Sequence, residues 1–264
     1  MLSQAVRTAL TLVPLFLLLA PAPGVGSLSI KPAFVEIELG KGRPSESISV
    51  ENVTSEEARY RIQVVHFTYN ESGNLTIVSP DKHSMASWIK CNPLEFTLAP
   101  KASRAVRLTI IPPKSLDPGE YWAAIWFEPL SYMTSVSDGG GRKVALKVET
   151  NILIPVIGRT PGVVYKCDLT DLSATKSSEG IDIAATVENP GSGRVKLKGS
   201  YEILNSAKAQ VAHGLIGDDT IMAGGKRIFT QKVKGEFPGA DYLVRVQYAS
   251  EKLPAILAGE TRPK

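Results

Sequence analysis

The chain has 264 residues, of which 43% are hydrophobic and 21% charged, and its formal net charge is +4. This length allows two domains of ordinary size or one large domain. The positive charge is small and scattered, and no run of Lys and Arg alternates with aromatic residues, which argues against a nucleic-acid-binding protein. The 22 Gly and 18 Pro residues, without helical runs between them, favour many short strands.

Residues 1–26 have the pattern of a secretory signal peptide. Arg7 supplies a positive charge, residues 10–20 form an apolar core, and the small residues Gly24 and Gly26 suit a cleavage site before Ser27. The apolar core is about 11 residues long, which is short of the roughly 20 that cross a bilayer. We therefore predict export with cleavage, the alternative being a short membrane anchor. No later segment is apolar enough to span a membrane.

The first part of the mature chain alternates between apolar and polar residues in the manner of strands. The expected strands cover residues 28–39 (either one strand or two strands broken at Pro32), 47–53, 58–69, 75–78, 96–98, 106–110, 120–127 and 144–156. The turn-forming runs at 40–42 and 117–119 separate some of them. Strands at this spacing predict an immunoglobulin-like β-sandwich over residues 27–158.

A second group of strands follows the Gly- and Pro-containing run 158–162. The expected strands cover residues 163–172, 181–187, 195–204, 210–215, 228–233, 242–248 and 253–257. They predict a second immunoglobulin-like domain over 159–264, so the fold class is all-β. A Pro-Gly turn precedes Tyr121 in the first domain and Tyr242 in the second. This likeness is either a shared structural device or convergent turn chemistry.

Catalytic and metal-binding patterns are absent from the sequence. His66, His83 and His213 are isolated, and none has the spacing of a metal site. No nucleophile motif and no phosphate-binding glycine loop occurs. We predict a protein that is not an enzyme and needs no cofactor or metal. Cys91 and Cys167 are expected to be free thiols, although an exported protein offers the chance of oxidation.

The stretch from Val144 to Val156 is the most distinctive pattern in the chain. One face carries apolar side chains at nearly every second position: Val144, Leu146, Val148, Ile152, Ile154 and Val156. It is long for a strand, since about 5–6 residues is usual. A long apolar strand of this kind is either buried centrally or is an edge that accepts another chain.

Several short motifs together resemble the PapD-like periplasmic chaperones of pilus and fimbria assembly. They are Ile30-Lys31-Pro32, Ser49-Val50-Glu51-Asn52, Trp88-Ile89, Leu98-Ala99-Pro100, residues 104–107, residues 117–121, the strand 144–156 and residues 188–193. Their order and spacing extend over nearly all of the mature chain.

The resemblance implies two immunoglobulin-like domains in an L-shaped arrangement and a periplasmic chaperone. Its partners would be secreted pilin-like subunits and an outer-membrane usher. The strand 144–156 would complete the sandwich of a subunit by donor-strand complementation, a form of strand addition. The six apolar side chains would contribute roughly 9–18 kcal/mol before ordering and association costs. In the alternative, the same side chains face the core of their own domain, and the protein is a secreted two-domain adhesive or structural module.

The family also places an Arg in its first strand and a Lys in its last strand, where they bind the terminal carboxylate of a subunit. At the corresponding places this chain has Phe34, with Lys31 nearby, and Asn151 or Leu153. Charge-assisted anchoring of a carboxylate would need other cations. Lys147 and Arg159 are candidates for that role.

Overall fold

The computed structural model describes residues 28–264 except 41, 131–135, 138–142, 145–150 and 240. The predicted signal peptide therefore lies outside the described residues. One short 3-10 helix, η1 (Ala86–Trp88), is the only helical element in the described ranges, and the remaining elements are strands. The all-β prediction is confirmed.

The strands of the first sandwich run from β1 to β12. They are β1 (Leu28–Lys31), β2 (Val35–Glu38), β3 (Ser45–Asn52), β4 (Ala58–Tyr69), β5 (Leu75–Val78), β6 (Ile89–Asn92), β7 (Glu95–Leu98), β8 (Ser103–Ile110), β9 (Glu120–Pro129), β10 (Val136–Ser137), β11 (Lys143–Val144) and β12 (Ile152–Arg159). One sheet has the order β1-β3-β8-β6, and the other has the order β2-β12-β9-β4-β5 with β7 also paired to β4. Among the described residues, β10 and β11 pair with each other and with no other strand.

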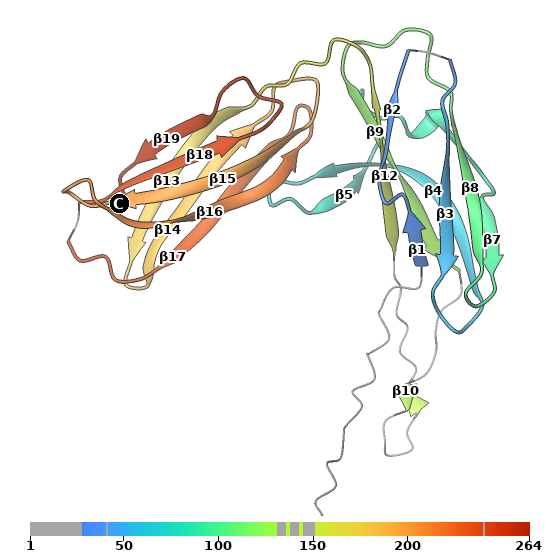
Figure 1. Ribbon diagram of the computed structural model, residues 1–264, viewed down its shortest axis with the longest axis horizontal. Helices are drawn as coiled ribbons and strands as arrows, with labels where there is room; N and C mark the ends of the chain where they lie inside the picture. The colour runs from blue at the N-terminus through green and yellow to red at the C-terminus, as the bar shows by residue number, and fades with distance from the viewer. Residues whose placement is uncertain (1–27, 41, 131–135, 138–142, 145–150, 240) are drawn as a thin grey trace, which may run out of the picture.

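The second sandwich contains the remaining strands. They are β13 (Asp168–Ser177), β14 (Gly180–Glu188), β15 (Val195–Leu204), β16 (Gln210–Ile221), β17 (Lys226–Lys234), β18 (Leu243–Ala249) and β19 (Leu257–Thr261). Their sheets have the orders β13-β14-β17 and β16-β15-β18-β19. The strands of the two sandwiches run at a steep angle to each other, which gives the molecule an L shape (Figure 1).

Each sandwich has its own hydrophobic core, built from alternate side chains of facing sheets. Ile48, Val106 and Ile125 are fully buried in the first core, and Ile181, Leu197 and Val246 in the second. The two cores are separate clusters. The division of the chain at residues 158 and 159 stays a prediction, although Arg159 still pairs with Glu120 of β9 in the sheet of the first sandwich.

Of the two alternatives for residues 28–39, the structure has the broken strand, because β1 pairs with β3 in one sheet and β2 pairs with β12 in the other. Other predicted strands differ from the observed ones. The strand expected at 163–172 begins at Asp168, and the one expected at 253–257 is β19, from Leu257 to Thr261. The short strand β6 was not predicted, since only Ile89 marks it as apolar in a run of polar residues.

The two tyrosines that follow the Pro-Gly turns form the same contact. The hydroxyl of Tyr121 donates to the carbonyl of Asp117 at 3.1 Å, and the hydroxyl of Tyr242 donates to the carbonyl of Pro238 at 2.5 Å. Each bond reaches back four residues, as in the tyrosine corner of immunoglobulin-like sandwiches. The shared sequence pattern therefore has the same structural role in both halves.

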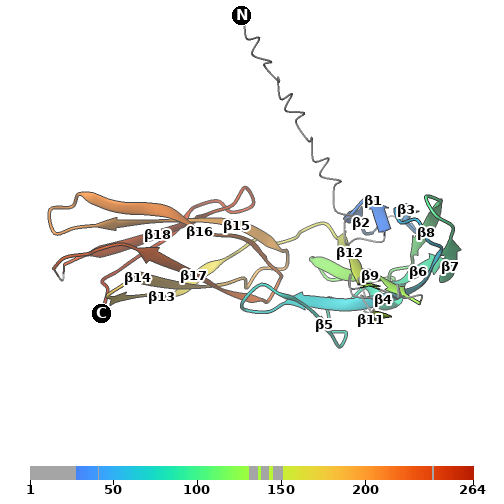
Figure 2. The ribbon, with the colours of Figure 1, turned by 90° about the horizontal axis from the view of Figure 1, so that it is seen from below.

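Three groups of contacts hold the sandwiches together. A polar group surrounds Glu120, and an apolar cluster joins Phe67, Trp122, Ala124 and Ile157 to Met222 and Ala223. The third group lies at the tip of the β4–β5 hairpin, which reaches the second sandwich (Figures 1 and 2). There the carboxylate of Glu71 pairs with Lys226 at 2.8 Å, and the backbone carbonyl of Glu71 accepts the N–H of Ile228 at 2.9 Å.

Candidate functional site

Strand β12 lies inside the β2-β12-β9-β4-β5 sheet for only half of its length. Along its whole length it pairs antiparallel with β9, from Ile152 opposite Phe127 to Arg159 opposite Glu120. On its other side it pairs with β2 in parallel, but only from Val156 to Arg159. Among the described residues, Ile152 to Pro155 therefore have no strand partner on that side.

The presence of Pro155 is consistent with a strand edge that has no strand partner at this position. Proline lacks a backbone N–H, so in sheets it is found on edge strands and at strand starts. The unpaired part of β12, which we call the open edge (Ile152–Pro155), continues towards residues 145–150, which are not described. The open edge is one of the edges at which this sandwich has backbone groups without a strand partner.

The predicted donor side chains fall into three groups. Ile154 and Val156 are 3% and 0% exposed and belong to the core of the first sandwich. Their side chains pack against their own domain, as in the alternative reading of this strand, and their contact with a client stays a prediction. Ile152 is half-buried and packs at the margin of the same core.

The other predicted donor residues lie before the open edge. Val144 is the second residue of β11 and pairs with Val136, while Leu146 and Val148 lie outside the described residues. The expected single strand 144–156 is thus observed as β11, an undescribed stretch, the non-strand residue Asn151, and β12. Strand β12 also extends three residues beyond the predicted end, to Arg159, because β2 pairs with it there.

The three predicted anchor positions do not come together as an anion site. Lys31 is exposed at the end of β1. Asn151 is exposed and its side-chain oxygen accepts the indole N–H of Trp126 at 3.1 Å. Phe34 is 42% exposed and immediately precedes Val35, the residue at which β2 begins to pair with β12.

A group of cations lies instead around the buried carboxylate of Glu120. Its oxygens accept the backbone N–H of Arg194 at 2.8 Å and the Arg159 Nε–H at 3.3 Å, and Lys252 Nζ lies 3.6 Å away. Arg194 also pairs with Glu36. Arg159, a candidate substitute for the anchor in the sequence analysis, forms ion pairs with Glu120, Glu36 and Glu38.

The environment of this group shifts several pKa values. Burial alone would raise the pKa of Glu36, but the hydrogen bond and charge of Arg194, with Arg159 and Lys252, lower it below its usual range. Burial lowers the pKa of Lys252, and the charges of Arg194 and Arg159 add to this effect. Glu36 is thus held as a carboxylate between the sandwiches. Arg194 and Lys252, which sequence reasoning missed, follow turn residues and carry no recognisable motif.

A cavity of about 680 Å³ opens beside this group. Phe34 from the first sandwich lines one part of it, and the start of β15, the end of β16 and the end of β18 with the residues that follow it line the rest. The lining residues are Phe34, Arg194, Lys196, Lys198, Thr220, Ala249, Ser250, Glu251 and Lys252, and we call this cavity the cationic pocket.

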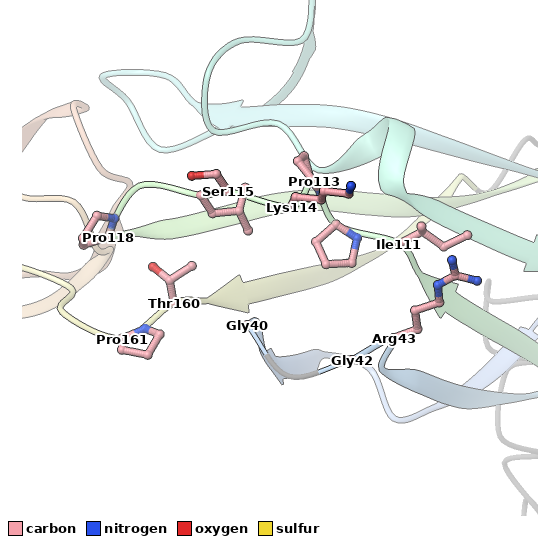
Figure 3. Close-up of a pocket in the computed structure, with 12 residues that line it drawn as sticks. Gly40, Gly42, Arg43, Ile111, Pro113, Lys114, Ser115, Pro118, Thr160 and Pro161 are labelled. Carbon is pink, nitrogen blue, oxygen red and sulfur yellow. The ribbon is translucent and has the colours of Figure 1, made fainter.

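A second cavity, of about 600 Å³, lies at the elbow between the sandwiches. Figure 3 shows Pro118 and Ser115 across from Thr160 and Pro161, with Ile111, Lys114 and Arg43 further along. Prolines and glycines supply half of its lining residues, and no nucleophile–base pair is present among the lining residues. Its arrangement suggests no chemistry.

The histidines and cysteines of the described chain have structural surroundings. His66 is buried, lies 3.1 Å from Asp81 and stacks on Trp122. Burial raises the pKa of the Cys91 thiol to about 11 and that of Cys167 to about 12, so neither is a reactive thiolate at neutral pH. Both are free thiols in the structure.

Within the residues that the structure describes, no group of His, Cys, Asp and Glu side chains is arranged to hold a metal ion. No helix in those ranges is long and apolar enough to cross a bilayer.

Comparison with known proteins gives matches among solved structures only, since no family model and no curated protein matches the chain. The fimbrial chaperone CfaA matches with a TM-score of 0.47 at 15% identity, over 90% of this chain and 99% of that one. The SafB chaperone, solved in complex with the SafA pilin of Salmonella enterica, matches with a TM-score of 0.47 at 13% identity, over 91% and 99%. The E. coli chaperone DraB matches with a TM-score of 0.43 at 14% identity, over 90% and 97%.

All three matched proteins are chaperones.

Proposed function

We propose that the protein is an exported periplasmic chaperone without enzymatic activity, and that it binds secreted subunits of a pilus, fimbria or other surface polymer. The observation that carries the proposal is the open edge at Ile152–Pro155, which continues into the apolar alternation of Val144, Leu146 and Val148. A strand of an incomplete subunit sandwich would pair with this edge and bury those side chains.

The burial of Ile154 and Val156 shortens the surface available to a client. Val144, Leu146, Val148 and Ile152 remain, and at about 1.5–3 kcal/mol each they give roughly 6–12 kcal/mol before ordering and association costs. The backbone ladder then contributes affinity, and alternate side chains contribute specificity. Strand β2 limits the added strand at Phe34, because β2 occupies the edge of β12 from Val156 onward.

A test compares subunit capture by the wild-type protein and by a Leu146→Asp/Ile152→Asp variant. Each protein is produced in a bacterial periplasm together with a pilin-like subunit, and the soluble complex is isolated and quantified. We expect at least a tenfold loss of complex in the variant, because two carboxylates replace apolar groups that become buried. Equal capture by both proteins would refute strand donation.

A matched control introduces the same charges elsewhere. Val211 and Leu215 are 47% and 75% exposed on β16, so Val211→Asp/Leu215→Asp tests the effect of two added carboxylates on expression and solubility. This control is expected to capture subunits normally. Amide exchange on the isolated protein adds a second measurement, and strong protection from Leu146 to Ile154 would favour the two-domain adhesive or structural module instead.

A further inference from the structure

The cationic pocket is built on one face of β15 and is closed by Phe34. Lys196 and Lys198 are exposed and two positions apart, so their side chains lie on the same outer face of the sheet. Lys196 is paired in register with Thr220 of β16, and Lys198 with Asp218 of β16 and Ala249 of β18. The two ammonium groups therefore have one carboxylate, that of Asp218, among these cross-strand neighbours.

The pocket has more positive than negative charge. Arg194, Lys196, Lys198 and Lys252 line it, against the single carboxylate of Glu251. Arg194 is held in place by Glu36 and Glu120 and lies over the Phe34 ring at 5.1 Å. It forms a fixed wall of the pocket and is not free to move towards a ligand.

The two lysines of β15 are available to a ligand. Lys196 pairs with Asp218 at 3.0 Å, but both side chains are more than half exposed, and such pairs contribute little and exchange readily. No ion pair of Lys198 is found in the part of the chain that the structure describes. An incoming carboxylate therefore meets ammonium groups without having to break a buried pair.

The position of the pocket indicates what reaches it. Phe34 stands at the point where β2 closes the open edge, and it is also the apolar wall of the pocket. A polypeptide lying along the open edge and turned aside by β2 would pass over Phe34 towards Lys196 and Lys198. The exposed ring offers apolar contact between the charges, which suits a polypeptide better than a simple inorganic anion.

We propose that the cationic pocket binds an extended polypeptide segment with acidic side chains, with Lys196 and Lys198 as the principal contacts and Phe34 as the apolar wall. The further statement that this segment belongs to a captured subunit rests on the proposed function. The binding of an acidic peptide to the pocket is independent of the proposed function, because it is measured without a subunit.

The test uses a fluorescein-labelled ten-residue peptide of alternating Glu and Ser, and a matched peptide of alternating Gln and Ser. Fluorescence anisotropy is measured at low salt and at 0.3 M salt. We expect the acidic peptide to bind and the Gln peptide to bind at least tenfold more weakly. Affinity for the acidic peptide should fall at the higher salt, because exposed charges are screened. Equal binding of the two peptides would overturn the proposal.

Two charge-reversal variants locate the binding. Lys196→Glu/Lys198→Glu is expected to weaken binding of the acidic peptide at least tenfold. Lys82→Glu/Lys90→Glu makes the same change of net charge at exposed positions of the first sandwich that are outside the pocket, and it is expected to change binding less than twofold. Thermal unfolding checks that all variants are folded. Unchanged binding in the first variant would refute the site.

Competition distinguishes a peptide site from a general anion site. Inorganic phosphate and a ten-residue oligothymidylate are added at the same concentration of negative charge as an unlabelled acidic peptide. Displacement by the peptide alone supports the proposal, and equal displacement by phosphate or oligonucleotide overturns it. The Leu146→Asp/Ile152→Asp variant should bind the peptide normally, so failure of the pocket and failure of strand donation give different results.

Discussion

In the second sandwich the last described residues contact both sheets. Strand β19 pairs with β18 in one sheet. Beyond β19, the carbonyl of Lys264 accepts the N–H of Lys176 at 3.0 Å, and the N–H of Lys264 donates to the carbonyl of Ala174 at 3.1 Å; Lys176 and Ala174 lie in β13 of the other sheet. In the first sandwich β12 receives β2 along only its second half. The two halves thus share a fold but not the way in which their final strand is paired.

The local devices of the two sandwiches are otherwise alike. Each has a tyrosine corner, at Tyr121 and Tyr242. Each also has Val-Glu-Asn at the end of an inner strand, where Asn52 is the last residue of β3 and Asn189 directly follows β14. Both asparagines are buried and donate to two or more backbone carbonyls. Since these devices recur, the open edge of the first sandwich is a local departure and not a sign of a poorly formed domain.

The largest effect is expected where the two sandwiches meet. Glu120→Gln removes the buried charge that faces Arg159, Arg194 and Lys252, and leaving those cations without it should cost about 3 kcal/mol. The free energy of unfolding in urea measures this. Glu251→Gln, an exposed carboxylate nearby, should change it by less than about 0.5 kcal/mol. If Glu120→Gln lowers the free energy of unfolding no more than Glu251→Gln does, the charge of Glu120 does not hold the two sandwiches together.

The buried asparagines test whether the two halves are equivalent. Asn52→Ala removes one hydrogen-bond donor from each of the carbonyls of Glu56, Leu98 and Ala99, and Asn189→Ala does the same to the carbonyls of Gly193 and Ile221. Each substitution should cost about 2 kcal/mol in urea unfolding, because buried carbonyls lose a hydrogen bond. The exposed Asn74→Ala serves as a control with little expected change. If only one substitution lowers the free energy of unfolding strongly, the buried asparagine stabilises one sandwich and not the other.

The tyrosine corners give the smallest expected effect. Tyr121→Phe and Tyr242→Phe each remove one hydrogen bond between a hydroxyl and a carbonyl while keeping the ring in place, so each should cost about 1 kcal/mol. Thermal unfolding followed by near-ultraviolet circular dichroism measures both. If one substitution is neutral, the likeness of the two Pro-Gly-Tyr patterns is only convergent turn chemistry.

Much of the fold could be predicted because side-chain alternation is a local property. The ranges of β4, β5 and β15 match the predicted ones, since each strand is bounded by turn residues and alternates strongly. The alternation could not show that the chain moves from one sheet to the other within residues 28–39, because the residues before and after that point both have the pattern of a strand. It also could not place Ile154 and Val156, since an apolar side chain is equally suited to its own core and to a client.

The candidate site was less predictable than the fold. The apolar residues of 144–156 were found from their pattern, but the cations of the pocket were not, because Arg194 and Lys252 lie far apart in sequence and next to turns. Phe34 was identified only as the absence of an expected arginine. Its place at the end of the open edge depends on the pairing of Val35 with Val156.

The sequence alone determined that this is an all-β protein with two groups of strands and an unusually long apolar alternation, because these are properties of neighbouring residues. The tertiary structure decided how much of that alternation is available. Parallel pairing with β2 covers β12 from Val156 to Arg159 and leaves Ile152 to Pro155 open. It also brought Arg194 and Lys252 of one sandwich beside Glu36 and Glu120 of the other. Contacts between residues so distant in sequence arise only when the chain has folded.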